Sequence, residues 1–148
     1  MAELTVRLID AGQSRELRRA ALRPHLEPGI ALSGDDLPGA LHLAAFDGSS
    51  LVSACMILPQ PCEWQRGRPA WRLRSMATEP TVRRTGAGAA VVRAAAEVAR
   101  DRGAELLWCP ARQPAIGFYQ RCGWQLHGQP FTTEYGPHRY MWLDLVGN

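Results

Sequence analysis

The sequence predicts a single domain of mixed α/β class, in which flanking helices cover a twisted, mostly antiparallel sheet of about seven strands. The first observation is the order of patterns along residues 1–148: strand, helix, two strands, strand, helix, strand, helix and two strands. The second is the turn Asp47-Gly48, which joins two apolar runs as in a β-hairpin. The third is a strand–helix–strand step through a glycine-rich turn, which predicts one parallel pair of strands.

Strands are expected where apolar and polar residues alternate, or where a short apolar run lies between turn residues. Residues 4–10 alternate in this way, as in a strand with one buried face. Residues 41–46 and 51–58 form the two arms of the hairpin, and Pro80 closes the strand that follows them. The seven expected strands are residues 4–10, 41–46, 51–58, 71–78, 106–109, 124–133 and 139–145.

Helices are expected between these strands. Ser14 is an acceptable N-cap for the first helix, which should run to about Leu26. The second helix is rich in alanine and has apolar residues at helical spacing, and Gly103 supplies its stop. The third helix ends at Gly123. The three expected helices are residues 14–26, 89–102 and 114–122.

Composition and charge exclude several classes of function. The net charge is +3 and the 17 basic residues, all arginine, are dispersed, so no nucleic-acid surface is expected. The longest charge-free apolar stretch, residues 51–58, is too short to span a bilayer. The four cysteines form no Cys-x-x-Cys pair and have no histidine at ligand spacing, so no metal site is expected. With no signal-peptide pattern at the N-terminus, we expect a cytoplasmic protein with reduced thiols.

The glycine-rich turn at residues 83–88, Arg-Arg-Thr-Gly-Ala-Gly, joins the strand at 71–78 to the alanine-rich helix. Such a turn exposes backbone N–H groups at the positive end of a helix, which suits a phosphate or pyrophosphate. A dinucleotide-binding turn would need a third glycine where Val91 stands, and a P-loop would need a lysine, which the chain lacks. A glycine-eased helix start without any ligand stays open from the turn alone.

Two longer segments resemble the GNAT superfamily of acyl-CoA-dependent N-acyltransferases. Residues 73–88, Leu-Arg-Ser-Met-Ala-Thr-Glu-Pro-Thr-Val-Arg-Arg-Thr-Gly-Ala-Gly, are similar to the acetyl-CoA-binding core of that family. Residues 114–124, Pro-Ala-Ile-Gly-Phe-Tyr-Gln-Arg-Cys-Gly-Trp, resemble its Ala-x-x-Phe-Tyr-x-x-x-Gly-Phe helix, with Trp124 in place of the phenylalanine. The two motifs stand in the family's order and spacing, and the resemblance covers residues 70–126 well.

The resemblance implies acetyl-CoA as cosubstrate and names the residues that would bind it. Backbone N–H groups of residues 84–89 would hold the pyrophosphate, with added charge from Arg83 and Arg84. The Met76 N–H would polarise the thioester carbonyl, and Met76 and Thr78 would pair with the pantetheine arm as an extra strand does. Many members carry an asparagine before the last helix, where this chain has Gln113 as a candidate replacement. The full expected set is Met76, Ala77, Thr78, Arg83, Arg84, Thr85, Gly86, Ala87, Gly88, Ala89, Gln113 and Phe118.

The chemistry implied by the resemblance is direct attack of an amine on acetyl-CoA. Tyr119 is the first choice for the acid that protonates the departing CoA thiolate; the alternative is that Phe118 and Tyr119 are an aromatic pair that packs the last helix on the sheet, and the motif match favours the acid. The proton acceptor is harder to assign, and Glu79, Glu134 and His138 are candidates, with His138 expected in a Gly-Pro turn between the last strands. A covalent route through Cys109 is disfavoured, because no histidine or aspartate stands beside it in sequence.

The leading hypothesis is therefore an N-acetyltransferase that acts on a small-molecule, peptide or protein amine. The acceptor should enter between residues 24–39 and the last hairpin, where Asp35 and Asp36 could attract a cation. A CoA-binding sensor or assembly subunit without turnover is the alternative, and a nucleotide-binding domain of the Rossmann kind is a more distant one. No nucleic-acid, membrane or metal partner is expected, and the oligomeric state, a homodimer included, is left open.

Overall fold

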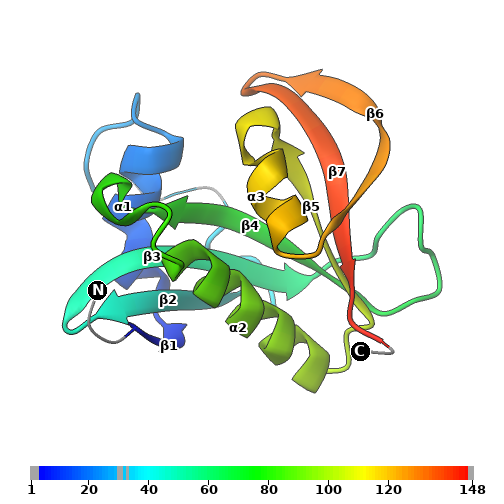
Figure 1. The fold of residues 1–148 in the computed structure, drawn as a ribbon, viewed down its shortest axis with the longest axis horizontal. Helices are drawn as coiled ribbons and strands as arrows, with labels where there is room; N and C mark the ends of the chain where they lie inside the picture. The colour runs from blue at the N-terminus through cyan, green and yellow to red at the C-terminus, as the bar shows by residue number, and fades with distance from the viewer. Residues whose placement is uncertain (1–3, 30–31, 33, 147–148) are drawn as a thin grey trace.

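A computed structural model describes residues 4–29, 32 and 34–146 of the chain (Figure 1). The elements follow one another in the order that the sequence predicts. The strands are β1 (Leu4–Ile9), β2 (Leu41–Asp47), β3 (Ser50–Pro59), β4 (Ala70–Thr78), β5 (Leu106–Arg112), β6 (Gln125–Thr133) and β7 (Gly136–Asp144). The helices are α1 (Ala11–Leu22), α2 (Ala87–Asp101) and α3 (Ile116–Arg121), with single 3-10 turns at Pro80–Val82 and Gln113–Ala115.

The described strands form one seven-stranded sheet in the order β1-β2-β3-β4-β5-β7-β6. Neighbouring strands are antiparallel except β4 and β5, which α2 connects as a parallel pair. The predicted fold class, strand number and single parallel step are therefore confirmed. The Rossmann alternative is wrong, because that fold requires a mostly parallel sheet.

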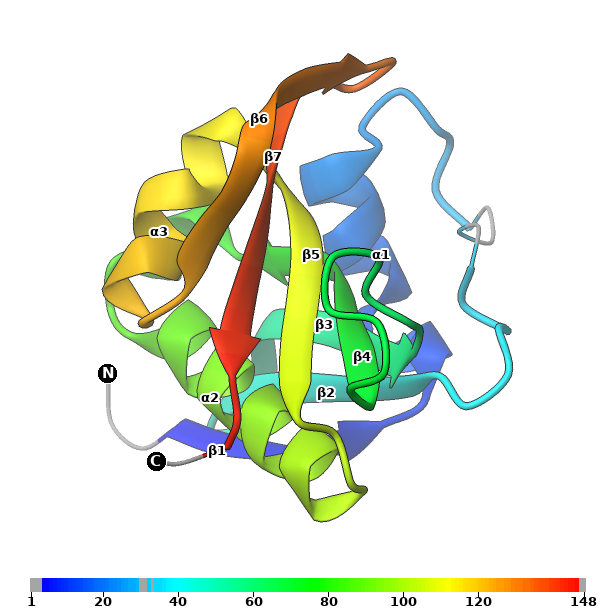
Figure 2. The same ribbon diagram turned by 90° about the vertical axis from the view of Figure 1, so that its right-hand side faces the viewer.

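The sheet lies between two layers of helices. Figure 2 shows α1 on one side and α2 with α3 on the other. The face of α2 that meets the sheet consists of small residues, which bring the helix axis close to the strands. Its buried members are Ala87, Gly88, Val91, Val92, Ala95, Ala96 and Ala99. Among the described helices, none is long and apolar enough to cross a membrane.

The sheet opens in its middle, between β4 and β5. These strands pair only where residues 70–72 lie beside residues 106–108. Beyond that point β4 continues along β3 as far as Thr78, while β5 continues along β7 as far as Arg112. The two halves of the sheet diverge from there, as Figure 1 shows, and this divergence positions the site.

The boundaries of all three helices differ from the expectation, and α3 begins at Ile116, after a 3-10 turn, rather than at residue 114. Asp10, not Ser14, is the N-cap of α1, and the Gln13 side chain accepts a hydrogen bond from the Asp10 N–H at 2.9 Å. The helix ends at Leu22 rather than Leu26, because a residue that precedes proline, here Arg23, disfavours helical backbone. Helix α2 begins at Ala87, two residues earlier than expected, with Gly86 as its N-cap.

Candidate active site

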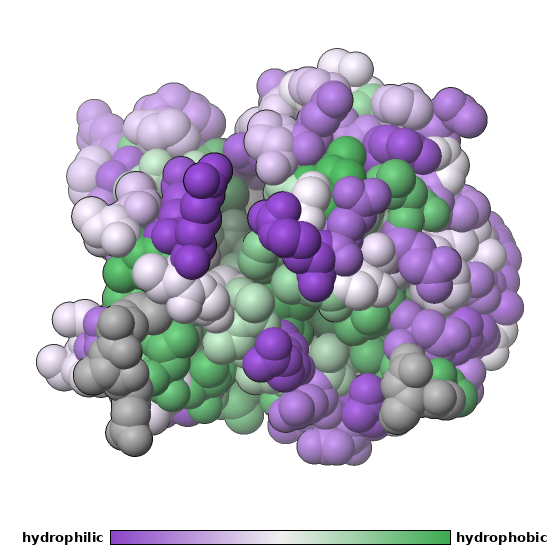
Figure 3. All heavy atoms as spheres, in the orientation of Figure 1, coloured by the Kyte–Doolittle hydropathy of each residue, from purple (hydrophilic) through white to green (hydrophobic). Residues whose placement is uncertain are grey.

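A cavity of about 710 Å³ lies where β4 and β5 separate. Residues 72–76 of β4 and 109–112 of β5 line it from the sheet. The segment after α1 forms one outer wall, and α3 with the β6–β7 turn forms the other. Figure 3 shows the surface hollowed between these two walls, with hydrophilic side chains on both sides of the hollow. This is the entrance that the sequence predicts for the acceptor.

A β-bulge in β4 shapes the inner end of this cavity. Ala54 pairs with Ala77 and Met56 pairs with Arg74, so Ser75 and Met76 together stand opposite one residue of β3. Ser75 has φ 55°, in the left-handed region that non-glycine residues rarely adopt. A bulge bends its strand and redirects the side chains and N–H groups beside it. Sequence reasoning missed it, because serine has no strong preference for this backbone.

The turn before α2 has the open geometry of an anion site. Gly86, the N-cap, has φ 94° and no side chain with which to cap the first helical N–H groups. A Cβ at Gly86 would meet no atom within 4 Å, so the turn faces open space. The Thr85 hydroxyl donates to the Val82 carbonyl, and so does the Thr85 N–H at 3.3 Å, so this amide is already used within the turn. The N–H groups of residues 87–89 come before the first intrahelical hydrogen bond, which Ala90 donates to the Gly86 carbonyl.

Several of the expected cosubstrate residues meet around Gly88. A Cβ added at Gly88 would lie 3.1 Å from Thr78 Oγ1 and 3.3 Å from both Met76 Cε and Phe118 Cε1. Strand β4, helix α2 and helix α3 therefore approach one another here only because the helix carries no side chain at this position. Gln113, by contrast, is exposed at the end of β5 and is not among the residues that line the cavity.

Tyr119 lines the cavity from α3 and is only 5% exposed. Its ring packs between Phe118 and Trp124, with centroids 5.1 and 4.9 Å away. Its hydroxyl lies within hydrogen-bonding reach of the Cys109 thiol. Burial, helped by the neighbouring thiols, raises the pKa of Tyr119 well above its ordinary value. The hydroxyl therefore stays protonated and can act as a proton donor.

The candidate proton acceptors are separated by the fold. His138 is 7% exposed and lines the cavity, but it lies within β7, paired with Arg112 and Phe131, rather than in the expected turn. Its Nδ1 stands 2.8 Å from the Gly136 carbonyl, so the proton of a neutral ring is placed on Nδ1 and Nε2 is left to accept. Glu79 follows β4 and does not line the cavity, whereas Glu134 lines its rim from an exposed position.

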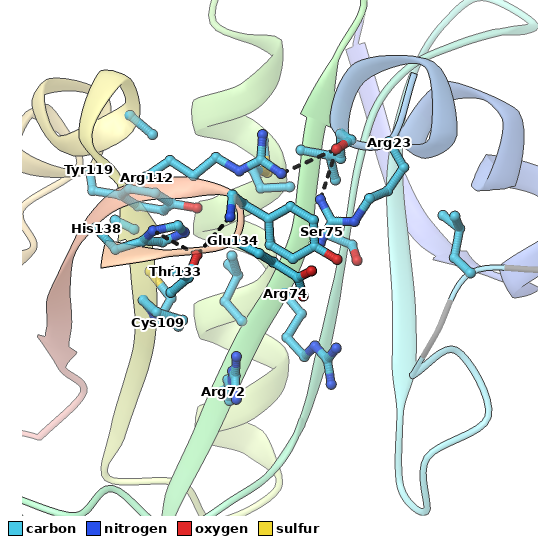
Figure 4. A pocket seen from close by; sticks show the side chains of 18 of the residues that line it. Arg23, Arg72, Arg74, Ser75, Cys109, Arg112, Tyr119, Thr133, Glu134 and His138 are labelled. Carbon is cyan, nitrogen blue, oxygen red and sulfur yellow. Dashed lines mark hydrogen bonds between the residues drawn. The ribbon is translucent and has the colours of Figure 1, made fainter. Parts of the chain in front are cut away.

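Four arginines that sequence reasoning did not assign also line the cavity: Arg23, Arg72, Arg74 and Arg112. Arg23 and Arg112 both donate to the Leu22 carbonyl, at 2.8 and 3.2 Å, and both lie over the Tyr135 ring. They thereby join the end of α1 to the β6–β7 turn (Figure 4). Arg72 and Arg74 were identifiable in principle, since their alternation with Trp71 and Leu73 predicts that they share one face of a strand.

Neither Asp35 nor Asp36, the acidic pair in the segment before β2, lines the cavity, and Asp36 is exposed. Asp35 is buried and accepts two hydrogen bonds from Arg18, at 2.7 and 3.0 Å, so it is not available to attract a cation. Arg18 is itself fully buried on α1 and also donates to Ser14 Oγ. Ser14 is thus an interior anchor for this pair rather than the expected cap. Within residues 24–39, beside which the acceptor is expected to enter, residues 30, 31 and 33 lie outside the described residues.

Comparisons with known proteins identify relatives over most of the chain. A family model described as the acetyltransferase (GNAT) family matches residues 11–124. The uncharacterized N-acetyltransferase YitI of Bacillus subtilis (strain 168) is 32% identical over 144 residues, which cover 96% of this chain and 97% of that protein.

Solved structures share the fold at lower identity. An N-acetyltransferase from Lactobacillus plantarum has a TM-score of 0.77 at 19% identity, covering 97% of this chain and 99% of its own. An aminoglycoside 6'-N-acetyltransferase complexed with coenzyme A has a TM-score of 0.74 at 16% identity, with 97% and 98% covered. FeeM, an N-acyl amino acid synthase from uncultured soil microbes, has a TM-score of 0.78 at 15% identity, with 98% and 92% covered.

Proposed function

The chain belongs to the GNAT family of acetyl-CoA-dependent acetyltransferases, and we propose that it transfers the acetyl group to a primary amine by direct attack within a ternary complex. The observation that carries this proposal is the cavity between β4 and β5. Tyr119 and the bulged residues Ser75 and Met76 all line it, and it opens between two walls through which an amine can enter.

The residues at the start of α2 fit the cosubstrate that the family uses. Acetyl-CoA supplies an activated thioester when it is bound. In the proposal, N–H groups at the uncapped start of α2 bind its diphosphate, and exposed Arg83 and Arg84 add positive charge. Gly88, Thr78 and Met76 meet between this turn and the cavity. The pantetheine arm of acetyl-CoA, bound along β4, would therefore place the thioester at the bulge. Gly86 supports this assignment, because its missing side chain leaves the turn accessible.

The reaction requires three proton transfers, two away from the nitrogen and one to the sulfur. The acceptor arrives mainly as an ammonium ion, since a primary amine has a pKa near 10, and one proton must leave before attack. The amine nitrogen then bonds to the acetyl carbon, the carbon–sulfur bond breaks, and the second N–H proton departs. The sulfur leaves as a thiolate and takes a proton from the enzyme. The products are the N-acetyl amine, CoA and one proton released to solvent.

We assign the two proton-transfer roles to Tyr119 and His138. Tyr119 suits the donor role because its hydroxyl is buried at the cavity and stays protonated. His138 suits the acceptor role because its Nδ1–H is oriented toward the Gly136 carbonyl, which leaves Nε2 for the ammonium proton. Glu79 is disfavoured for this role by its position outside the cavity.

The buried thiols argue against an acyl-enzyme. Burial raises the pKa of Cys109 to about 12, although the Tyr119 hydroxyl partly opposes this, so almost no thiolate exists at neutral pH. The alternative of a CoA-binding sensor without turnover has no specific observation in its favour. All four cysteines are free, which supports the proposal that the protein works in the reducing cytoplasm.

Tyr119→Phe tests the proposed function. The variant removes one hydroxyl and keeps the ring packing, so CoA affinity measured by calorimetry should change little. Turnover, measured as CoA release over a panel of amines, should fall roughly 10²- to 10⁴-fold if the hydroxyl is the acid. Tyr140→Phe, in the aromatic cluster with Trp64 and Trp108, is the matched control and should retain turnover. Equal turnover in wild type and Tyr119→Phe would reassign Tyr119 to packing.

A further inference from the structure

The acceptor side of the cavity is strongly biased toward positive charge. Four arginines line it, and the one carboxylate among its described lining residues is Glu134, which is exposed at the rim. The histidines His25 and His138 also line it and add no negative charge. An acceptor that carried several positive charges would meet repulsion throughout this cavity.

The four arginines divide into two pairs with different surroundings. Arg23 and Arg112 lie at the rim, where both donate hydrogen bonds to the Leu22 carbonyl and both lie over the Tyr135 ring. Arg72 and Arg74, in contrast, form no ion pair or side-chain hydrogen bond with another described residue. They stand two residues apart on β4, just before the bulge, and therefore share the face of the strand that is turned to the cavity.

Arg72 is the less solvated member of this second pair. It is half-buried, its guanidinium lies 5.1 Å from the centre of the Trp108 ring, and its Nε is buried with no hydrogen-bond partner. Burial and the charge of Arg74 both lower the pKa of Arg72. Placing a half-buried charge without a counter-ion beside a like charge costs stability, and the contact with the Trp108 ring offsets this cost only for Arg72.

Arg74 is held against the far wall. A Cβ at Gly34 would lie 2.9 Å from both terminal guanidinium nitrogens of Arg74, so this side chain rests against the Gly34 backbone. The Arg18–Asp35 pair fixes the residue next to Gly34, and through it the surface on which Arg74 lies. The two guanidinium groups are thereby positioned at the cavity without being neutralised by it.

We propose that the acceptor is a small-molecule amine that also carries a carboxylate or phosphate group, which Arg72 and Arg74 bind while the amine points toward Tyr119 and the bulge. This inference rests on the proposed acetyl transfer and adds the substrate class. Guanidinium groups form paired N–H···O bonds with both oxyanions, and bonds of this kind to charged groups are the stronger ones. An oxyanion would also relieve the repulsion between the two arginines.

Paired substrates that differ only in the anion test this proposal. CoA release is measured with L-phenylalanine against L-phenylalaninamide, with phosphoethanolamine against ethanolamine, and with spermidine as a polycation. The first pair distinguishes a carboxylate and the second a phosphate. We expect kcat/KM to favour one of the anionic amines over its neutral partner by roughly 10- to 100-fold, and spermidine to be the poorest substrate. The amide has the lower amine pKa, so a preference for the free carboxylate would run against intrinsic reactivity.

The variants Arg72→Gln and Arg74→Gln identify the groups responsible. Each should raise KM for the preferred anionic amine roughly 10- to 100-fold, leave kcat nearly unchanged, and leave the neutral partner unaffected, because the contact is made equally before and during reaction. Arg66→Gln, at an exposed arginine away from the cavity, is the matched control. Thermal midpoints check folding, and Arg72→Gln should not lower the midpoint, since it removes a costly buried charge.

The outcomes separate the inference from the function on which it rests. A preference for an anionic amine that disappears in Arg72→Gln supports the proposal. A preference for neutral or polycationic amines, or an anion preference that survives both substitutions, overturns it while the acetyl transfer stands. A protein that binds CoA but releases none from acetyl-CoA with any amine of the panel overturns the proposed function, and the substrate class falls with it.

Discussion

The buried pair Arg18–Asp35 should contribute more to folding than any exposed ion pair of this chain, and Asp35→Asn tests this. Arg18 is fully buried and donates to both carboxylate oxygens, and two further N–H groups of its guanidinium donate to Ser14 Oγ and the Ala11 carbonyl. The substitution keeps the shape of the side chain and one acceptor oxygen. It removes the negative charge and leaves the Arg18 guanidinium buried without a counter-ion, with Arg15 also nearby.

The size of the effect follows from that geometry. Breaking a buried pair by removing one partner costs about 3–5 kcal/mol, which is a large part of the roughly 5–15 kcal/mol that stabilises a typical domain. For a chain of 148 residues, each kcal/mol corresponds to about 2–4 °C in Tm, so a decrease of about 10 °C is expected. Urea unfolding followed by circular dichroism measures the free energy directly, and a constant slope would show that the folding transition keeps its character.

The pair should also give a distinct pH dependence. Burial alone would raise the pKa of Asp35, but the hydrogen bonds and charge of Arg18 outweigh it and lower the pKa. A carboxyl with a lowered folded pKa stabilises the fold above its unfolded pKa of about 3.9, and this contribution is lost as pH falls through the folded value. Wild type and Asp35→Asn should therefore differ fully at pH 7 and converge below about pH 4. Burial and the charge of Arg18 lower the pKa of His42 while the charge of Asp35 opposes them, so the destabilisation at mildly acid pH should be larger in Asp35→Asn than in wild type.

Glu16→Gln is the matched control, because it also converts a carboxylate on or near α1 to an amide. Glu16 pairs with Arg19 at 2.6 Å, but its side chain is 63% exposed and solvent screens the interaction. We expect no measurable change in Tm from this substitution. A loss at Asp35→Asn as small as that of Glu16→Gln, or a difference that persists unchanged at pH 3, would refute the reasoning.

Two further predictions concern the cosubstrate side. Gly86→Glu should abolish CoA binding in calorimetry, because it places a carboxylate where the diphosphate is proposed to sit. Gly103→Glu, at the other end of α2, is the control and should bind CoA normally, since the two glycines have φ of 94° and 93° and equal open space, so the backbone strain of the two variants is matched. CoA binding by Gly86→Glu would show that the diphosphate site lies elsewhere. Wild-type protein mixed with acetyl-CoA should show no acetyl adduct in intact mass spectrometry, because the Cys109 pKa of about 12 leaves at most roughly one molecule in 10⁴ with a thiolate at neutral pH. Cys109→Ser should also lose far less turnover than Tyr119→Phe. A stable adduct that disappears in Cys109→Ser would instead establish a covalent route.

The parts of the fold that the sequence predicts well depend on local signals. The hairpin follows from Asp47-Gly48, and the parallel step follows from a glycine turn between a strand and an alanine-rich helix. The first helix was placed three residues late, because Ser14 and Asp10 are both good caps and only the packing of Arg18 assigns Ser14 to the interior. Local preference cannot distinguish a cap from a buried hydroxyl that serves a distant side chain.

The candidate site also has one part that local sequence signals predict and another part that depends on long-range pairing. Most of the expected cosubstrate residues lie in one stretch, 76–89, so a contiguous motif was sufficient to name them. The bulge at Ser75 escaped prediction because it depends on the register between two strands rather than on the serine itself. His138 was expected in a turn, since Gly136-Pro137 suggests one, but pairing with β5 extends β7 through these residues. Register and pairing are long-range properties that a single sequence shows poorly.

The difference between the two sides has a consequence for specificity. The proposed cosubstrate contacts come largely from backbone groups of one strand, one turn and one helix, so substitutions of outward side chains there change little. The proposed acceptor cavity is assembled from described residues of five segments that are distant in sequence, at 22–26 with 32, 72–76, 109–112, 115–119 and 133–138, and its character depends on side chains. Replacing Arg72 and Arg74 with uncharged residues would alter the charge of the proposed acceptor cavity and leave the turn before α2 unchanged. The fold can therefore retain one acyl donor while its acceptor changes, and we expect Arg72 and Arg74 of β4 to determine the acceptor specificity of this chain.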